Sequence, residues 1–310
     1  MSRRRMLLQR VLPAVVSLGV LAFLFQSVDF RLVVAALNWQ VVSYLLPALI
    51  VYGVVTLVLE AASITILMPR KPEGFGMWTA ARIKCASYLI GIVNFALGAG
   101  ALTILLRRRA SLDLAESASV VVTITSVDLV ILMMMAAAGA LSDTGPAGAN
   151  AGLFVILVIA FVVGMTVLRM PANLGPIERL RSLTIFQALR TTRLKLLVQL
   201  AAFRLLFTSS FIALGGAAFA GFDIAIPLSD LTVGMVFVGV VGALPIAIAG
   251  LGTGQVAVVA VFGHLADRET LLALSLVLTA GLLALRAGMG LVMAREYTRE
   301  ALEESRAAEA

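Results

Sequence analysis

The sequence contains very few of the side chains that form disulfides or bind metal ions. Cys85 is the only cysteine, so no intrachain disulfide can form. His264 is the only histidine, which excludes a metal site built on several histidine ligands. The sequence also shows no pairing of a nucleophile with a base. We therefore expect no catalytic residues, no metal site and no cofactor.

Apolar side chains dominate the chain instead. Of its 310 residues, 61% are hydrophobic, and the mean hydropathy is +1.05. A soluble domain is roughly 45–50% apolar, and about 18 apolar residues suffice to cross a bilayer core. Several runs exceed that length, which predicts an all-α polytopic membrane protein. The net charge is +7, but in a membrane protein the basic residues first report orientation, and we expect no nucleic-acid partner.

Six apolar segments have the length of simple membrane spans: 11–28, 40–68, 117–141, 151–169, 196–221 and 270–293. The first follows a basic start, but no A-x-A site comes after it, so we interpret it as an uncleaved span and not a signal peptide. Segments 80–106 and 228–262 are harder to place. Each is either one more span, giving eight simple spans, or a hairpin that enters the membrane and turns back.

The basic residues discriminate between these alternatives, because cytoplasmic loops carry most of the Lys and Arg. With eight simple spans and a cytoplasmic N-terminus, eleven basic residues lie on each side. With two re-entrant hairpins, 107–109 and the 169–195 loop become cytoplasmic, leaving twenty basic residues inside and only Arg31 and Arg268 outside. We therefore predict about six full spans plus two re-entrant helical hairpins. Both termini would be cytoplasmic in a bacterial-type inner membrane.

A weak internal repeat points to the same topology. The stretch LGAG begins at Leu97 and LGTG begins at Leu251, an offset of 154 residues. At the same offset, Asp113 and Asp267 each precede a long apolar segment, as a helix N-cap does. The second half would repeat the first half in the opposite orientation across the membrane. Such an inverted repeat is typical of secondary transporters. In the alternative interpretation, the glycines only permit close helix packing.

These features predict a single transmembrane domain over 1–310. We expect repeat one to cover 1–150, repeat two to cover 151–295, and a charged cytoplasmic tail to cover 296–310.

The stretches YLIGIVNFALGAGALTILLRRRASLDLAESASVVVTITSVDLVIL and GALPIAIAGLGTGQVA resemble the two motif regions of the lysylphosphatidylglycerol synthase transmembrane, or flippase-like, family. The resemblance covers nearly the whole chain and implies a role in moving or handling lipids or lipid-linked headgroups. No synthase domain follows residue 295, so we do not expect aminoacyl transfer by this chain. Several positions depart from the family pattern: Leu97 replaces Pro, Gln255 replaces Glu, and apolar or neutral residues stand at Ala101, Ile104, Ile124 and Thr125.

Polar residues inside apolar segments are the candidate substrate-binding residues. Asp128 lies mid-span, where a lone carboxylate is costly and must face protein or water. We expect it to bind a cation or headgroup amine, or to pair with Arg204 or Arg286, whose guanidinium groups suit a phosphate unless they extend to the interface. The other candidates are Glu60 and the residues around the expected hairpin tips: Asn94, Gln255, Gly98, Gly100, Gly252 and Gly254.

We therefore expect this protein to translocate a membrane phospholipid or a lipid-linked headgroup, with anionic lipid bound at the cytoplasmic face. The alternative is a non-transporting membrane subunit that anchors or regulates a lipid-modifying enzyme. The lost motif side chains favour that alternative.

Overall fold

The structure is a computed structural model, and it describes residues 30–69, 72–92, 95–142, 151–170, 183–243 and 253–307. All regular structure in these ranges is helical, which confirms the prediction of an all-α polytopic membrane protein. The first expected span, 11–28, lies outside the described residues.

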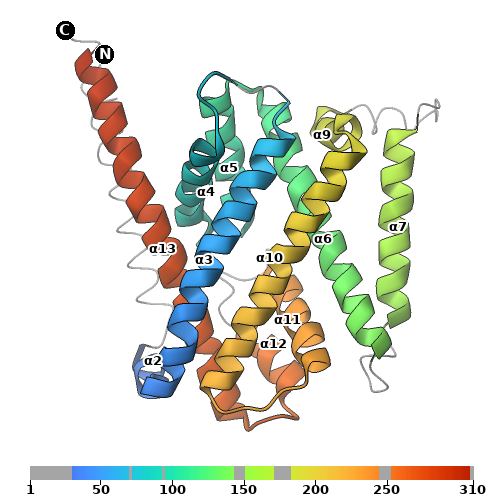
Figure 1. Cartoon of the computed structure of the whole chain (residues 1–310), viewed down its shortest axis with the longest axis vertical. Helices are drawn as coiled ribbons and strands as arrows, with labels where there is room; N and C mark the ends of the chain where they lie inside the picture. Colours follow the sequence, from blue (N-terminus) through green and yellow to red (C-terminus); the bar gives the residue numbers. More distant parts are fainter. Residues whose placement is uncertain are drawn as a thin grey trace.

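Four long helices form the frame of the molecule (Figure 1). They are α3 (Trp39–Leu67), α6 (Leu114–Ser142), α10 (Leu194–Gly221) and α13 (Arg268–Ala307). Each is long and apolar enough to cross a membrane. α7 (Ala151–Arg169) packs beside α6 and matches the predicted bounds. α13 extends beyond the predicted end at 293, because residues 294–307 are rich in Ala, Glu and Arg, which favour helix in water.

Two pairs of short helices replace the two segments that were hard to place. The first pair is α4 (Met77–Gly91) and α5 (Phe95–Ala110), and the second is α11 (Leu228–Ala243) and α12 (Thr253–Phe262). At about 1.5 Å per residue these helices are roughly 15–24 Å long, shorter than a bilayer core of about 30 Å. The members of each pair pack against each other.

Glycines show how closely the first pair approaches. A Cβ placed on Gly98 would lie 2.7 Å from the Cα of Gly91, so the two backbones touch where α4 ends and α5 begins. Gly98 and Gly100 lie inside the first turns of α5, which differs from the expectation that these glycines form the turn itself. In the second pair, Gly234 lies against the ring of Phe262.

α3 and α10 pack against each other in opposite directions along the middle of the molecule (Figure 1). Gly221, the last residue of α10, lies against the backbone of Val41 near the start of α3. The short helix α2 (Phe30–Ala36) lies near the start of α3, whereas α9 (Gln187–Thr191) lies near its end. We call these two ends of the molecule the α2 end and the α9 end.

The order of elements recurs at the offset of 154 residues. Shifting α3 by 154 gives 193–221, and α10 covers Leu194–Gly221; shifting the start of α6 gives 268, where α13 begins. Shifting α2 gives 184–190, which η2 (Thr184–Phe186) and α9 cover. Asp267 is an N-cap as expected, because its carboxylate accepts the N–H of Thr270 at 2.8 Å. At Asp113 the backbone N–H donates to Glu116 at 3.2 Å, which is the reciprocal bond of a capping box.

Candidate functional site

Arg204 lies at the centre of a cluster of charged side chains between the long helices. Its side chain is fully buried on α10. Its Nη1 donates to Glu60 Oε1 of α3 at 3.2 Å and to Asp128 Oδ2 of α6 at 3.3 Å. Its Nη2 donates to Ser63 Oγ at 2.8 Å and lies 3.2 Å from Glu60 Oε2. One guanidinium thus joins three helices.

Lys84 of α4 adds the first helical pair to this cluster. Its Nζ lies 3.1 Å from Glu60 Oε1 and 5.4 Å from the centre of the Tyr88 ring. Glu60, Lys84, Asp128 and Arg204 are called the charge cluster below. Two carboxylates and two cations make the cluster neutral, so the cost of burying each charge is offset by a partner of opposite sign.

The charge cluster lies well inside the apolar length of its helices. Asp128 is the middle residue of α6, and Arg204 is more than two turns from either end of α10. A charge at such a position costs roughly 2.5–3.5 kcal/mol on insertion scales, so it persists only with partners or for a function. Ser63 supports the arrangement, because its hydroxyl also donates to the carbonyl of Leu59 at 2.6 Å.

Two side chains of the cluster are buried and two are partly exposed. The Arg204 side chain is 0% exposed and that of Glu60 is 7% exposed, whereas Lys84 and Asp128 are 17% and 28% exposed. A ligand can therefore meet an ammonium group on one side and a carboxylate on the other. It cannot reach the guanidinium without a rearrangement.

Arg286 of α13 lies beside the cluster but outside it. Its guanidinium is within hydrogen-bonding reach of the Tyr52 hydroxyl on α3. The Tyr52 ring in turn packs against Phe207 and Phe211 of α10. Among the described residues no carboxylate pairs with Arg286 at 4 Å or less, so it is a partly buried cation without an acidic partner. It is available to an anionic group.

The structure brings together three of the residues predicted from the sequence, Asp128, Arg204 and Glu60. It also places Arg286 close by. Sequence reasoning missed Lys84 and Ser63. Lys84 lies in segment 80–106 but was not among the candidate residues, although the apolar residues around it, in AARIKCASYLI, indicate a helix that is partly buried.

The remaining predicted residues lie apart from the charge cluster. Gln255 is buried in the first turn of α12, and Gly98, Gly100 and Gly254 begin the second helix of each pair. Asn94 and Gly252 lie outside the described residues. Among the residues that the structure does describe, no group of three His, Cys, Asp or Glu side chains is placed to hold a metal ion.

The charge cluster, the helix pairs and the apolar frame are features of an integral membrane protein with a polar centre. Comparison with curated proteins yields no match. Residues 10–286 match the family described as Lysylphosphatidylglycerol synthase TM region, and the chain therefore belongs to this family.

Proposed function

We propose that this protein moves phospholipids or lipid-linked headgroups across a bacterial-type cytoplasmic membrane. One observation carries the proposal: a neutral cluster of four charges lies deep between α3, α6, α10 and α4. A polar headgroup needs partners of both signs to pass an apolar core, and these four side chains supply them. Family membership supports the same class of function.

The fold itself does not require these charges, as the repeat at an offset of 154 indicates. The positions that correspond to Glu60, Lys84, Asp128 and Arg204 in the other half are Leu214, Val238, Leu282 and Ile50. Leu214 is buried in a hydrophobic core to which both halves contribute, so an apolar side chain suffices at that position. A cluster that stability does not demand is better explained by a ligand.

The two pairs of short helices support transport further. We propose that α4–α5 and α11–α12 are re-entrant hairpins, which enter from opposite sides of the membrane as parts of an inverted repeat. Their arms are too short to cross, and non-helical backbone at membrane depth is tolerated beside protein or a water-filled cavity. Lys84 places one hairpin in contact with the charge cluster. Substrate sites at such hairpins are typical of secondary transporters.

In this mechanism Arg286, Asp128 and Arg204 have separate roles. Arg286 holds the phosphate of the headgroup, because it has no acidic partner among the described residues and its planar fork matches a phosphate. Asp128, the most exposed carboxylate of the cluster, binds an amine or other cation of the headgroup. Arg204 holds Asp128 and Glu60 in place when no substrate is present.

The test is lipid movement in liposomes that contain the purified protein. Fluorescent phospholipids with different headgroups are followed by an impermeant quencher, which reports the fraction in the outer leaflet. We expect faster movement of at least one headgroup class than in protein-free liposomes. Asp128→Asn and Arg286→Gln should each slow it roughly tenfold, the cost of one charge-assisted hydrogen bond. Arg107→Gln, which removes an exposed charge elsewhere, should have no effect.

Equal rates for wild type, Asp128→Asn and Arg286→Gln would contradict the assigned roles. No movement of any lipid by the wild-type protein would contradict transport itself.

One observation favours the second candidate, a non-transporting subunit that anchors or regulates a lipid-modifying enzyme. The charges of the cluster pair fully with one another, as in a purely structural network. This alternative predicts a stable complex with such an enzyme after mild solubilisation, unaffected by Asp128→Asn, and no lipid movement by the isolated protein.

A further inference from the structure

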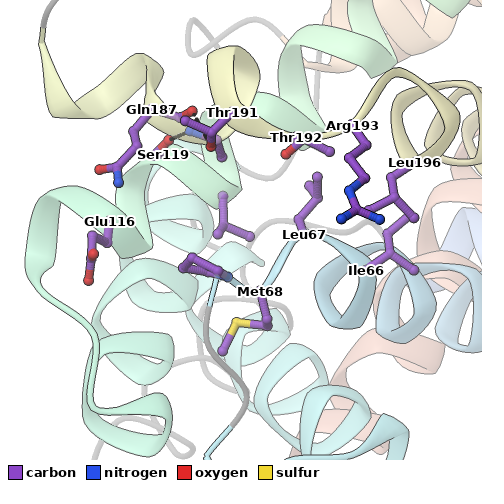
Figure 2. Close-up of a pocket in the computed structure, with 13 residues that line it drawn as sticks. Ile66, Leu67, Met68, Glu116, Ser119, Gln187, Thr191, Thr192, Arg193 and Leu196 are labelled. Carbon is purple, nitrogen blue, oxygen red and sulfur yellow. Dashed lines mark hydrogen bonds between the residues drawn. The ribbon is translucent and has the colours of Figure 1, made fainter.

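A second polar site lies at the α9 end, apart from the charge cluster. A cavity of about 320 Å³ opens between the last residues of α3, the first turns of α6 and α10, and α9 (Figure 2). Because one water molecule occupies about 30 Å³ in the liquid, this volume suits a headgroup or a small solute but not acyl chains.

The cavity has one polar wall and one apolar wall. Figure 2 shows Gln187, Thr191 and Thr192 on the α9 side, with Leu67 and Met68 of the α3 end opposite them. Arg193, directly before α10, extends its guanidinium beside Leu67 and Leu196. Such a lining presents hydroxyl, amide and guanidinium donors to one face of a ligand.

The polar wall is held in place by contacts to two long helices. Ser119 of α6 accepts the backbone N–H of Ala188 at 2.6 Å. Arg169, the last residue of α7, donates to the carbonyl of Leu189 at 2.9 Å and to that of Thr192 at 2.7 Å. The cavity is therefore a formed site and not a gap beneath a loose loop.

Arg193 gives the cavity its charge preference. It is exposed, and no carboxylate among the described residues pairs with it. It stands at the N-terminus of α10, where the helix dipole favours an anion. Glu116 also lines the cavity, but its carboxylate caps the start of α6 by accepting the N–H of Asp113 at 3.2 Å.

The corresponding place at the α2 end has different chemistry. At the offset of 154 residues, Gln187, Thr191 and Arg193 correspond to Val33, Leu37 and Trp39, and Ser119 corresponds to Ala273. Val33 is buried there within the hydrophobic core. Leu37 and Trp39 are exposed there. The same elements thus carry apolar side chains at the α2 end, so the polar lining at the α9 end is not imposed by the fold.

A packed layer separates the cavity from the charge cluster on the same three helices. Along α10, Arg204 follows Leu196 by eight residues, or about 12 Å. Between them Leu200 is 0% exposed, as is Thr123 of α6. The cavity and the cluster are therefore two sites.

We propose that this cavity binds a phosphate group, carried by a lipid headgroup in the adjacent leaflet or by a small phosphorylated solute. Arg193 makes the charged contact, and the hydroxyl of Thr192 donates beside it, whereas that of Thr191 already donates to the carbonyl of Gln187 at 2.9 Å. Binding at this site does not depend on the transport proposed above.

The test is calorimetric titration of the purified protein in an uncharged detergent. The probes are glycerol 3-phosphate and a short-chain phosphatidylglycerol. Both carry a phosphate group, which belongs to a small solute in the first and to a lipid headgroup in the second. We expect at least one to bind, and Arg193→Gln to weaken its affinity roughly tenfold to a hundredfold, as for loss of a charged hydrogen bond. Arg193→Lys should retain part of the affinity, because it keeps the charge but loses the fork.

Two controls separate this site from the others. Arg107→Gln removes a charge from the exposed end of α5, outside the cavity, and should bind like wild type. Asp128→Asn should also bind like wild type, so a failure of the transport proposal leaves this test intact. Binding of the lipid alone or of the solute alone identifies the source. Binding of neither probe, or equal affinities for Arg193→Gln and Arg107→Gln, would overturn the proposal.

Discussion

For Arg204, the sequence predicted that the charge has a buried partner, but not how the helices bring its partners together. A lone charge in an apolar run indicates a buried partner, and the sequence suggested Asp128 as one candidate. Glu60 and Asp128 both meet Arg204, although they come from helices far apart in the chain. Which of two arginines would pair with Asp128 could not be predicted, because that choice depends on how the helices rotate and cross.

Removing the guanidinium should destabilise the fold strongly. In Arg204→Met, Asp128 loses the guanidinium that pairs with it, and Glu60 keeps only Lys84. Breaking a buried pair costs about 3–5 kcal/mol, since the remaining charge is left unpaired. We expect a large fall in the unfolding midpoint of the detergent-solubilised protein.

The matched control also neutralises Asp128, the partner that Arg204→Met leaves unpaired. The double variant Asp128→Asn, Arg204→Met keeps the Glu60–Lys84 pair and should recover much of the lost stability. If the double variant is no more stable than Arg204→Met alone, unpaired charge is not the cause of the loss.

Asp267 offers a prediction on pH at the start of α13. Hydrogen bonds from the backbone and hydroxyl of Thr270 lower the pKa of its carboxyl. A group whose pKa is lowered by folding stabilises the fold above its unfolded pKa and loses that contribution as the pH falls through the folded pKa. Amide exchange in the first turn of α13 should therefore be faster in Asp267→Ala than in wild type at neutral pH, with the difference vanishing in acid.

Asp267→Asn is the control for this effect, because Asn is also a good N-cap but does not titrate. Its exchange in the first turn should stay slow in acid. Equal pH dependence in wild type and Asp267→Asn would show that another group is responsible.

At the scale of elements, apolar length predicted the long helices and left the short ones open. α3, α6, α7 and α10 match the expected spans within a few residues, because uninterrupted apolar runs leave few alternatives. The segments 80–106 and 228–262 were ambiguous, since the spacing of their apolar residues does not reveal where the chain ends one helix and turns back in another. In the first pair the reversal is made possible by contact between Gly91 and Gly98, which no spacing rule in the sequence identifies.

Gly98 and Gly100 should respond in opposite ways to alanine. In Gly98→Ala the new methyl group would meet the backbone of Gly91 at 2.7 Å, so the α4–α5 pair must open, at roughly 1–3 kcal/mol. A Cβ on Gly100 meets nothing within 4 Å, and alanine favours helix by up to about 1 kcal/mol. We expect a lower unfolding midpoint for Gly98→Ala and an unchanged or higher one for Gly100→Ala.

This pair of variants also tests the two interpretations of the LGAG stretch. Loss of lipid movement in Gly100→Ala, with stability intact, would show that the glycine serves a ligand and not only packing.

At the scale of the whole molecule, the repeat at an offset of 154 residues relates elements that share few residue identities. α3 and α10 run in opposite directions, and the charge cluster and the polar cavity each have an apolar counterpart in the other half. The proposed inverted repeat accounts for both facts: the two halves share the backbone plan, whereas the polar side chains of each site correspond to apolar ones in the other half. Such an asymmetry would give the two sides of the membrane different chemistry.

The proposed re-entrant hairpins predict which end of the molecule faces which side of the membrane. Arg108, near the end of α5, lies at the α9 end, and His264, after α12, lies at the α2 end. With Cys85 replaced by Ala, single cysteines at these positions should differ towards an impermeant thiol reagent on whole cells. We expect Arg108→Cys to react only after lysis and His264→Cys to react in intact cells, because both side chains are exposed.

The eight-span alternative predicts the reverse for the first position. A simple span over 80–106 would carry residue 108 to the outside, where the cysteine reacts in intact cells. In that case the two halves could not be related by inversion, and nine basic residues would move to the outer face, against the usual bias. Protection of position 108 would instead place the α9 end in the cytoplasm. The polar cavity beneath α9 would then face cytoplasmic phosphates and the inner leaflet, and Lys84 would enter the charge cluster from that same side.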